Sequence, residues 1–171
     1  MRMQDKVVLI TGATGGIGAA TAIQFLNEGA SVFLTGRSPE KLDALAKKLN
    51  NPAKIQSCVV EAIDEAAVER SITQCLSEFG RVDSIIANAG TEGKVQALEE
   101  YSLDDFNQTL LVNVTGVWLY LKHGLQPMRD QKSGSFVAIS SGAGSVGFPG
   151  LCPYSASKHA VNGLIKTACL E

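Results

Sequence analysis

The sequence predicts an α/β fold in which a doubly wound parallel sheet is covered by helices on both faces. Short apolar segments alternate along the chain with longer segments of helical periodicity, which is typical of parallel strands joined by crossover helices. The apolar segments lack the strict alternation of half-exposed strands, so we expect each strand to be buried on both faces. A glycine-rich turn from Thr11 to Gly18 joins the first strand to the first helix.

Five strands and five helices are expected in alternation. The predicted strands are Lys6 to Thr11, Ser31 to Thr35, Lys54 to Val60, Val82 to Ala87 and Ser135 to Ser140. The predicted helices lie near Ile17 to Glu28, Pro39 to Leu49, Glu65 to Phe79 and Leu103 to Met128, with a last one from about Tyr154 to the end of the chain.

Capping residues mark several of these helix ends. Ser38, Asp64 and Ser102 stand where a side chain can accept a hydrogen bond from a free backbone N–H at a helix start. Gly29 and Gly80 stand where the first and third helices are expected to stop. No linker, repeat or low-complexity stretch interrupts the pattern, so residues 1–171 are interpreted as one domain.

Composition and charge favour a globular protein that acts on small molecules. Hydrophobic residues make up 45% of the chain and charged residues 19%, and the formal net charge is -2. The chain has no run of Lys and Arg, which argues against nucleic acid or an anionic membrane as a partner. No apolar stretch reaches the roughly 20 residues that a membrane-spanning helix needs. The cysteines form no C-x-x-C pair and no signal peptide opens the chain, so we expect reduced thiols in a cytoplasmic protein without a metal site.

The glycine-rich turn has the setting of a dinucleotide-binding site, because it follows a strand and opens a helix. Gly12 permits the tight turn, while Gly16 and Gly18 keep side chains away from a pyrophosphate and from the contact of helix with strand. Free N–H groups at the helix start attract the phosphate charge. A turn that serves packing alone is the alternative. The spacing fits two forms of the motif, through Gly15 or Gly16, and the glycines alone do not choose between them. Within the turn, cofactor contacts are assigned to Gly12, Thr14, Gly16, Ile17 and Gly18.

The end of the second strand indicates which dinucleotide binds. NAD sites carry an Asp or Glu about 20 residues past the turn, where it binds the ribose hydroxyls. Here the segment reads Thr35-Gly36-Arg37-Ser38 and holds no carboxylate. A guanidinium pairs with a 2′-phosphate. Arg37 therefore favours NADP(H), with NAD(H) as the alternative if Arg37 is only a solvated loop residue.

Tyr154 and Lys158 lie four residues apart and therefore share one face of the last predicted helix. A lysine ammonium beside a phenol stabilises the phenolate, so the phenol can donate its proton to a forming alkoxide near neutral pH. Ser141 follows the fifth strand at the carboxyl edge of the sheet, where ligands of open α/β sheets bind, and its hydroxyl can orient a substrate carbonyl. Together with a dinucleotide site, these residues predict hydride transfer to or from a carbonyl.

The order and spacing of the motifs resemble the classical short-chain dehydrogenase/reductase family over the whole chain. That family pairs a T-G-x-x-x-G-x-G turn with N-A-G after the fourth strand, an Asn in a helix, a Ser before the Tyr, and Y-x-x-x-K. The resemblance implies a Rossmann-like single domain, and it selects the form of the turn that uses Gly16. The matching residues are Thr11 to Gly18, Asn88-Ala89-Gly90, Asn113, Ser141 thirteen residues before Tyr154, and Lys158.

The resemblance also implies a role for each matching residue. Tyr154 is the acid/base, Lys158 assists it and binds the nicotinamide ribose, and Ser141 positions the carbonyl. Asn113 holds a water in a proton relay toward Lys158. The segment from Asn88 through Ala89 to Gly90 backs the adenosine side of the pocket and stabilises the sheet.

Three departures from the family pattern are visible. Ala87 stands where many members have a first Asn, and Glu61 occupies the third-strand Asp position that contacts adenine. Family members also continue beyond the point that corresponds to Glu171, into a further strand, a substrate loop and a final strand. We therefore expect a longer gene product. If 171 residues were the whole protein, we would expect weak cofactor binding, low thermal stability and no measurable turnover.

The predicted activity is the interconversion of a ketone or aldehyde with an alcohol, by use of NADP(H). An NAD-preferring member of the same family and a catalytically silent nucleotide-binding fragment are the alternatives. The helix from Leu103 to Met128 carries more apolar residues than one face against a sheet requires, which predicts a homodimer or homotetramer. The resemblance implies that this helix and the last one pair across a two-fold axis.

Overall fold

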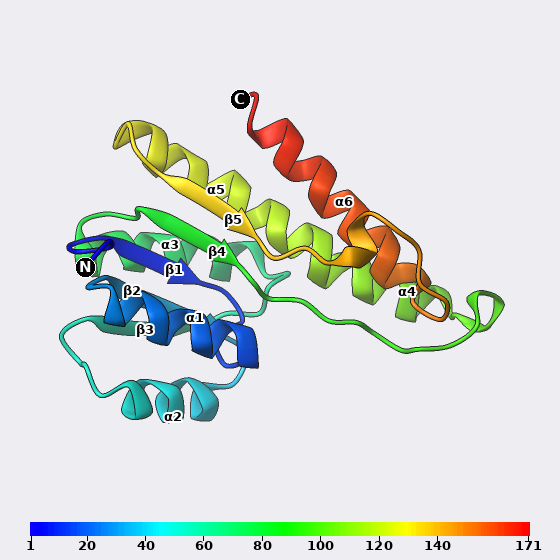
Figure 1. Ribbon diagram of the computed structural model, residues 1–171, viewed down its shortest axis with the longest axis horizontal. Coiled ribbons are helices and arrows are strands. Elements are labelled where there is room, and N and C mark those ends of the chain that lie inside the picture. The colour runs from blue at the N-terminus through cyan, green and yellow to red at the C-terminus, as the bar shows by residue number, and fades with distance from the viewer.

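The five strands form a single parallel sheet in the computed structural model, which describes all residues from Met1 to Glu171 (Figure 1). The order of the strands across the sheet is β3-β2-β1-β4-β5, and every neighbouring pair is parallel. The carboxyl ends of all strands therefore meet at one edge. This order confirms the predicted doubly wound sheet, in which the chain moves outward from β1 in both directions. The strands span Val7–Ile10 (β1), Ser31–Gly36 (β2), Ile55–Val59 (β3), Ser84–Ala87 (β4) and Ser135–Ala138 (β5).

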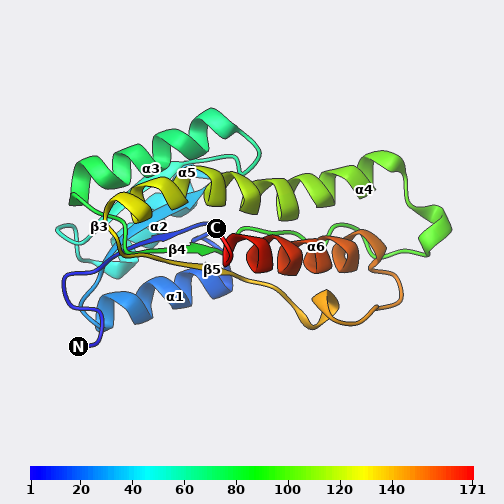
Figure 2. The ribbon, with the colours of Figure 1, turned by 90° about the horizontal axis from the view of Figure 1, so that it is seen from above.

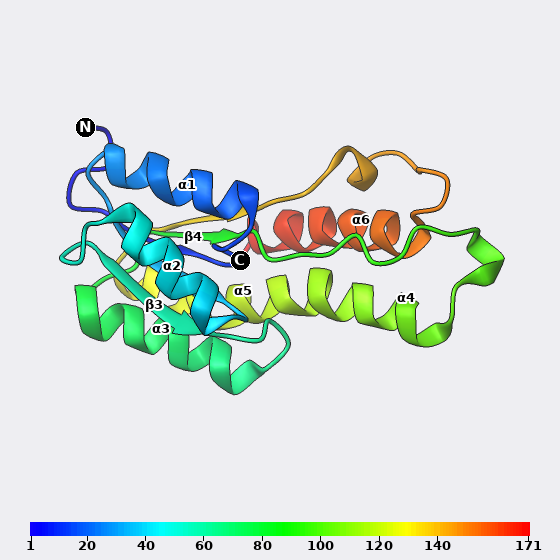
Figure 3. The same cartoon turned by 90° about the horizontal axis from the view of Figure 1, so that it is seen from below.

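Helices cover both faces of the sheet (Figures 2 and 3). One face packs against α1 and α2, the other packs against α3 and α5, and α6 lies alongside α4 and α5. The helices span Gly16–Asn27 (α1), Pro39–Leu49 (α2), Glu65–Phe79 (α3), Leu103–Leu110 (α4), Gly116–Asp130 (α5) and Cys152–Ala168 (α6). Three shorter turns complete the chain: the 3₁₀ turns Leu98–Glu100 (η1) and Gly142–Gly144 (η3), and the π-helical turn Leu111–Thr115 (η2).

The central strands carry the core because helices cover them on both sides. Val8 and Ile10 of β1 belong to the cluster under α1 and α2, whereas Val7 and Leu9 of the same strand belong to the cluster under α3 and α5. Every residue of β1 and β4 is buried. This burial explains why these two segments of the sequence show no polar alternation.

The edge strands β3 and β5 differ from the predicted burial on both faces. Their residues alternate between covered and exposed, and Val59 and Val137 are 49% and 42% exposed. The prediction was wrong for these two strands because β-branched residues favour the extended conformation whether or not both faces are covered. The residue types of a strand therefore do not report its place in the sheet.

The predicted capping residues occupy the ends of helices. Ser38, Asp64 and Ser102 each accept a hydrogen bond from the backbone N–H three residues further on, at 3.2, 3.0 and 3.1 Å respectively. Each bond satisfies an N–H that has no partner within its helix. Gly80 ends α3 in the left-handed conformation with φ of 74°, and Gly29 follows α1 with φ of 96°.

The helix predicted from Leu103 to Met128 is interrupted. α4 ends at Leu110, the π-helical turn follows, and α5 then continues to Asp130. A π turn widens the helix locally by one residue and leaves the apolar pattern on either side intact, so the prediction from periodicity missed it. The turn contains Asn113, which is 1% exposed.

A buried carboxylate, Asp83, joins the amino ends of β1 and β4. It accepts hydrogen bonds from Lys6 Nζ and the Val7 N–H, both at 3.0 Å, and from Arg81 Nε and Nη2, at 2.7 and 2.6 Å. Burial raises the pKa of Asp83, but the hydrogen bonds from Arg81, Val7 and Lys6 outweigh burial and hold this pKa below its usual range. Asp83 is therefore ionised in the folded state over a wider pH range than in the unfolded chain.

The substitution Asp83→Asn is expected to lower the free energy of unfolding at pH 7 by about 1–3 kcal/mol, because the buried Val7 N–H and the half-buried cations of Lys6 and Arg81 lose their charged acceptor. Folding lowers the pKa of this carboxyl, so the ionised group stabilises the fold fully at pH values above its unfolded pKa of about 3.9. This stabilisation is lost as the pH falls through the pKa of the folded state. The difference between wild type and variant should therefore shrink below about pH 4. Urea unfolding at several pH values measures the effect, with the exposed Asp43→Asn as the control. Equal stability of the two variants at pH 7 would contradict it.

Candidate active site

The carboxyl edge of the sheet opens into a cleft of about 730 Å³, a size typical of small-molecule sites. The cleft extends from the glycine-rich turn, past the end of β2, to the residues that follow β4. It brings together most of the residues that the sequence assigned to a cofactor. Nine of them line it: Gly12, Thr14, Gly16, Ile17, Arg37, Glu61, Asn88, Ala89 and Gly90.

The glycines of the turn have different roles. Gly12 has φ of 59°, and a Cβ on it would lie 2.8 Å from the Cα of Ala89. Gly18 does not line the cleft, and a Cβ there would lie 2.5 Å from the Gly12 carbonyl oxygen and 2.9 Å from Asn88 Nδ2. A Cβ on Gly16, by contrast, would meet no atom within 4 Å. Gly12 and Gly18 therefore allow close packing, whereas Gly16 leaves space in the cleft beside the N-terminus of α1, where free N–H groups suit a phosphate.

Thr11 and Asn88 hold the turn against the segment after β4. Thr11 Oγ1 accepts hydrogen bonds from the backbone N–H groups of Asn88 and Ala89, at 3.0 and 2.8 Å. In return, Asn88 Nδ2 donates to the carbonyls of Thr11 and Gly12, at 3.0 and 3.1 Å. Thr11 was identified only as the first residue of the motif, and the structure shows that its hydroxyl connects the two halves of the cleft floor.

The end of β2 places cationic side chains along one side of the cleft. Arg37 is exposed and lines the cleft beside Gly36. Lys41, in the first turn of α2, lines the same side and was not predicted. Its position four residues after Arg37, across the start of a helix, is the signal in the sequence that could have identified it. Glu61 lies across from them after β3, where its carboxylate accepts a hydrogen bond from the Ala62 N–H at 3.2 Å.

Tyr154 and Lys158 lie in the first turns of α6 and share one face, with Lys158 Nζ 5.6 Å from the centre of the Tyr154 ring. Lys158 is 7% exposed, and its Nζ donates to the carbonyl of Ile139 at 2.7 Å, a contact that the sequence did not predict. Burial lowers the pKa of Lys158. A Cβ on Gly90 would lie 3.7 Å from Lys158 Nζ, so the ammonium reaches the end of the cleft.

Ser141 precedes the 3₁₀ turn η3, beyond the end of β5. Its Oγ accepts a hydrogen bond from the Ala143 N–H at 3.2 Å. The turn is held against α6 by Asn162, whose Nδ2 donates to the Gly144 carbonyl at 2.9 Å. The turn that follows Ser141 and the helix that carries Tyr154 are thus in direct contact, although no hydrogen bond joins the side chains of Ser141 and Tyr154.

Asn113 lies between the segment after β4 and α6. Its Oδ1 accepts from the Thr91 N–H at 2.8 Å, and its Nδ2 donates to the Thr91 carbonyl at 2.8 Å and to Ser157 Oγ at 2.9 Å. These bonds place Asn113 beside Gly90, where Lys158 also reaches. No hydrogen bond joins Asn113 to Lys158, so the relay implied by the resemblance requires a bridging water between them.

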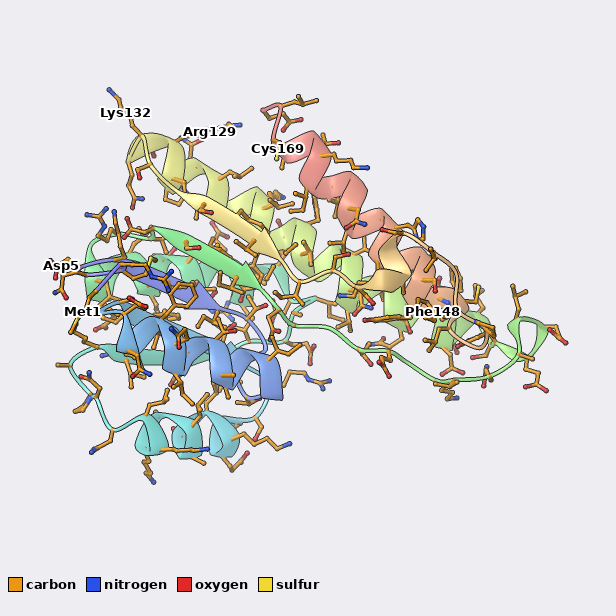
Figure 4. All side chains as sticks on the ribbon, in the orientation of Figure 1. Met1, Asp5, Arg129, Lys132, Phe148 and Cys169 are labelled. Atoms are coloured by element: carbon orange, nitrogen blue, oxygen red, sulfur yellow. The ribbon has the colours of Figure 1, made fainter.

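Apolar side chains surround the Ser141 side of the site. Val146 and Phe148, between η3 and α6, are 56% and 46% exposed, and Val95 after β4 is 70% exposed. Figure 4 shows Phe148 at the end of the molecule that α4 and α6 form. The Tyr101 hydroxyl donates to the Gly150 carbonyl at 2.8 Å and ties the two loops of this end together.

The arrangement suits an extended dinucleotide with a reacting group near Lys158. The glycine-rich turn and the N-terminus of α1 can hold a pyrophosphate, and Arg37 can hold a charged group on the adenosine side. Tyr154 and Lys158 do not line the cleft themselves, but the buried Lys158 ammonium lies beside the Tyr154 ring and next to Gly90, which does line it. The site can therefore bind a phosphate-bearing cofactor and offer a phenolic proton to a substrate that reacts with this cofactor.

Comparisons with known proteins agree with this geometry. A family model described as short chain dehydrogenase matches residues 6–171. Levodione reductase of Leifsonia aquatica is 37% identical over 173 residues, which cover 99% of this chain and 65% of the reductase. The chain therefore spans less than two thirds of the length of that relative.

Solved structures resemble the whole chain as well. The crystal structure of levodione reductase superposes with a TM-score of 0.95 at 37% identity, over 99% of this chain and 67% of that one. The crystal structure of NAD+-bound xylitol dehydrogenase gives a TM-score of 0.96 at 33% identity, over 99% of this chain and 66% of that one. In the present structure no helix has the length and apolar character of a membrane span.

Proposed function

The chain belongs to the short chain dehydrogenase family, and on this premise we propose that it acts as an oxidoreductase that transfers hydride between NADP(H) and a carbonyl or secondary alcohol. One observation carries the proposal. The buried ammonium of Lys158 lies beside the Tyr154 ring and close to Gly90, at the end of the dinucleotide cleft. This proximity supports the assignment of Tyr154 and Lys158 to the nicotinamide end of the cofactor site.

In this mechanism the bound nicotinamide supplies or accepts the hydride, and the protein moves the proton. Tyr154 donates its phenolic proton to the carbonyl oxygen during reduction, and Lys158 stabilises the phenolate that remains. Ser141 uses its hydroxyl to orient the carbonyl, and Asn113 holds a water that returns a proton toward Lys158. Because the Lys158 ammonium is desolvated, its effect on a nearby phenolate is stronger than in water.

The cofactor is proposed to be NADP(H), with Arg37 against the 2′-phosphate. Arg37 and Lys41 line the same side of the cleft, and the end of β2 carries no carboxylate to bind free ribose hydroxyls. Xylitol dehydrogenase, similar in fold, was crystallised with NAD+. NAD(H) is therefore the alternative cofactor to NADP(H) for a member of this family.

Arg37→Ala is expected to weaken NADPH binding by about 1.5–3 kcal/mol, the range for a hydrogen bond to a charged group, and to leave NADH binding nearly unchanged. Adding Gly36→Asp should shift the preference toward NADH, because a carboxylate repels the 2′-phosphate and accepts from the ribose hydroxyls. Fluorescence titration with both cofactors measures the two effects, and Arg70→Ala, an exposed arginine outside the cleft, is the control. Tighter binding of NADH by the wild type would refute the assignment.

The proposed activity is tested on the full-length gene product by NADPH titration together with a screen of ketones, aldehydes and secondary alcohols. The exposed apolar side chains of Val146, Phe148 and Val95 favour apolar carbonyl substrates in that screen. Oxidation of NADPH that depends on a carbonyl supports an oxidoreductase. Binding without oxidation of NADPH supports the alternative, a silent nucleotide-binding module.

A homodimer or homotetramer remains part of the proposal. On the outer side of α5 and the π turn, Trp118 and Leu111 are 43% and 40% exposed, which supports pairing of copies through this face. Val117 and Leu121 are buried within the chain instead, so they do not contribute to such an interface. The mass in solution, from light scattering, decides between a monomer and an oligomer.

A further inference from the structure

Ser157 stands between Tyr154 and Lys158 in the sequence, has no exposed surface, and takes part in a chain of hydrogen bonds. Its hydroxyl accepts from Asn113 Nδ2 at 2.9 Å and donates to the Tyr154 carbonyl at 2.7 Å. The amide of Asn113 is bonded in turn to the backbone of Thr91 through both its oxygen and its nitrogen, each at 2.8 Å. The chain of bonds therefore joins the segment after β4, the π turn and α6.

The donor and the acceptor of each hydrogen bond in this chain are determined. The backbone N–H of Thr91 can only donate, so the Asn113 oxygen faces Thr91 and its amide nitrogen faces Ser157. Because the amide nitrogen can only donate, the proton of Ser157 goes to the Tyr154 carbonyl. Asn113 and Ser157 are 1% and 0% exposed, so water does not replace these partners.

The chain of bonds connects the cofactor cleft with the helix that carries the proposed acid/base residue. Thr91 lines the cofactor cleft next to Gly90, whereas Tyr154 carries the phenol. A movement of α6 away from Thr91 stretches the bond between Asn113 and Ser157, and such bonds weaken steeply with distance. The bond from Ser157 to the Tyr154 carbonyl lies within α6 and ties the Ser157 hydroxyl to the first turn of the helix. Lys158 is held separately, by the carbonyl of Ile139.

We propose that Ser157 is a positioning residue, which fixes the first turn of α6, and with it the phenol of Tyr154, relative to the cofactor end of the cleft. The role rests on the proposed function, because a positioning residue matters only if the reaction takes place. It concerns the alignment of Tyr154 and not the binding of the cofactor, since Ser157 does not line the cleft.

The test removes the hydroxyl with Ser157→Ala. We expect kcat for carbonyl reduction to fall at least about tenfold, because small misplacements of reacting groups are costly. The dissociation constant of NADPH should change less than about twofold, which separates positioning from binding. Ser157→Thr keeps a hydroxyl at the same place and should retain kcat within about threefold. Ser155→Ala is the matched control, because Ser155 lies in the same helix and its buried hydroxyl has no partner.

A second readout needs neither cofactor nor turnover. In the wild type and in Ser155→Ala, NMR should show slow hydrogen exchange of the Asn113 side-chain amide, because both its hydrogens are bonded and buried. Exchange should be faster in Ser157→Ala. Wild-type kcat in Ser157→Ala, or equal losses of kcat and NADPH affinity, overturns the proposed role alone. A full-length wild type that reduces no carbonyl overturns the proposed function and this role together.

Discussion

Tyr154→Phe is expected to lower turnover by at least about 10²-fold while NADPH binding changes little, because the variant keeps the ring and loses the transferable proton. The ring contact with Lys158, at 5.6 Å from Nζ to the ring centre, remains possible for Phe. Carbonyl-dependent oxidation of NADPH measures turnover, and fluorescence titration measures binding.

The same substitution should leave thermal stability unchanged. Hydrogen bonds within the chain engage the Tyr154 carbonyl and not its hydroxyl, so removal of the hydroxyl breaks none of them. Tyr101→Phe gives the opposite contrast, because the Tyr101 hydroxyl donates to the Gly150 carbonyl at 2.8 Å and its removal should lower the melting temperature. Near-normal turnover in Tyr154→Phe would end the mechanism proposed above.

Gly18→Ala is expected to destabilise the fold by about 1–3 kcal/mol, the cost of extra atoms in a well-packed site. The new methyl group would lie 2.5 Å from the Gly12 carbonyl oxygen and 2.8 Å from the Ala13 Cα. Both are backbone atoms, so the turn itself must shift. We therefore expect lower stability in urea and weaker NADPH binding in the same variant.

Gly16→Ala separates these two effects. A Cβ on Gly16 meets no atom within 4 Å, and alanine favours a helix over glycine, so stability should be retained. NADPH binding should still weaken, because the methyl group enters the cleft that Gly16 lines. Gly163→Ala is the control, since Gly163 is also free of close atoms and lies outside the cleft. Unchanged NADPH affinity in Gly16→Ala would show that the phosphate binds elsewhere.

Local signals in the sequence predicted the parts of the fold that depend on neighbouring residues. Ser38, Asp64 and Ser102 cap helices as expected, because a cap needs only its own first turn. The exposure of Val59 and Val137 was not predicted, because it depends on which strand reaches the edge of the sheet and on what covers it there. That information lies in contacts between distant segments.

In the candidate site, too, local spacing was predictable from the sequence and contacts between distant segments were not. The glycine-rich turn and the pair of Tyr154 and Lys158 were found from spacing. The structure places the turn at the carboxyl edge of the sheet and bonds Lys158 to the Ile139 carbonyl, just after β5. The partners of these residues were not found. The Ile139 carbonyl that accepts a hydrogen bond from Lys158 is a backbone group. Because every residue carries such a group, the residue type does not predict this contact. Ser157 was not predicted either, because the spacing of the motif does not show which distant residue a serine between Tyr154 and Lys158 contacts.

The π turn changes what the loss of one residue would do to this long helical segment. In an α-helix each residue turns the chain by about 100°, so a residue removed from the middle of α5 would rotate every later side chain of that helix by this angle. α4 packs beside α6, while α5 packs on α3 and β4, so such a rotation would carry apolar side chains of α5 away from α3. The wider turn at Leu111–Thr115 holds one residue more than an α-helical turn. A single-residue deletion there would convert it to a regular α-helical turn and leave the inner faces of both helices in place.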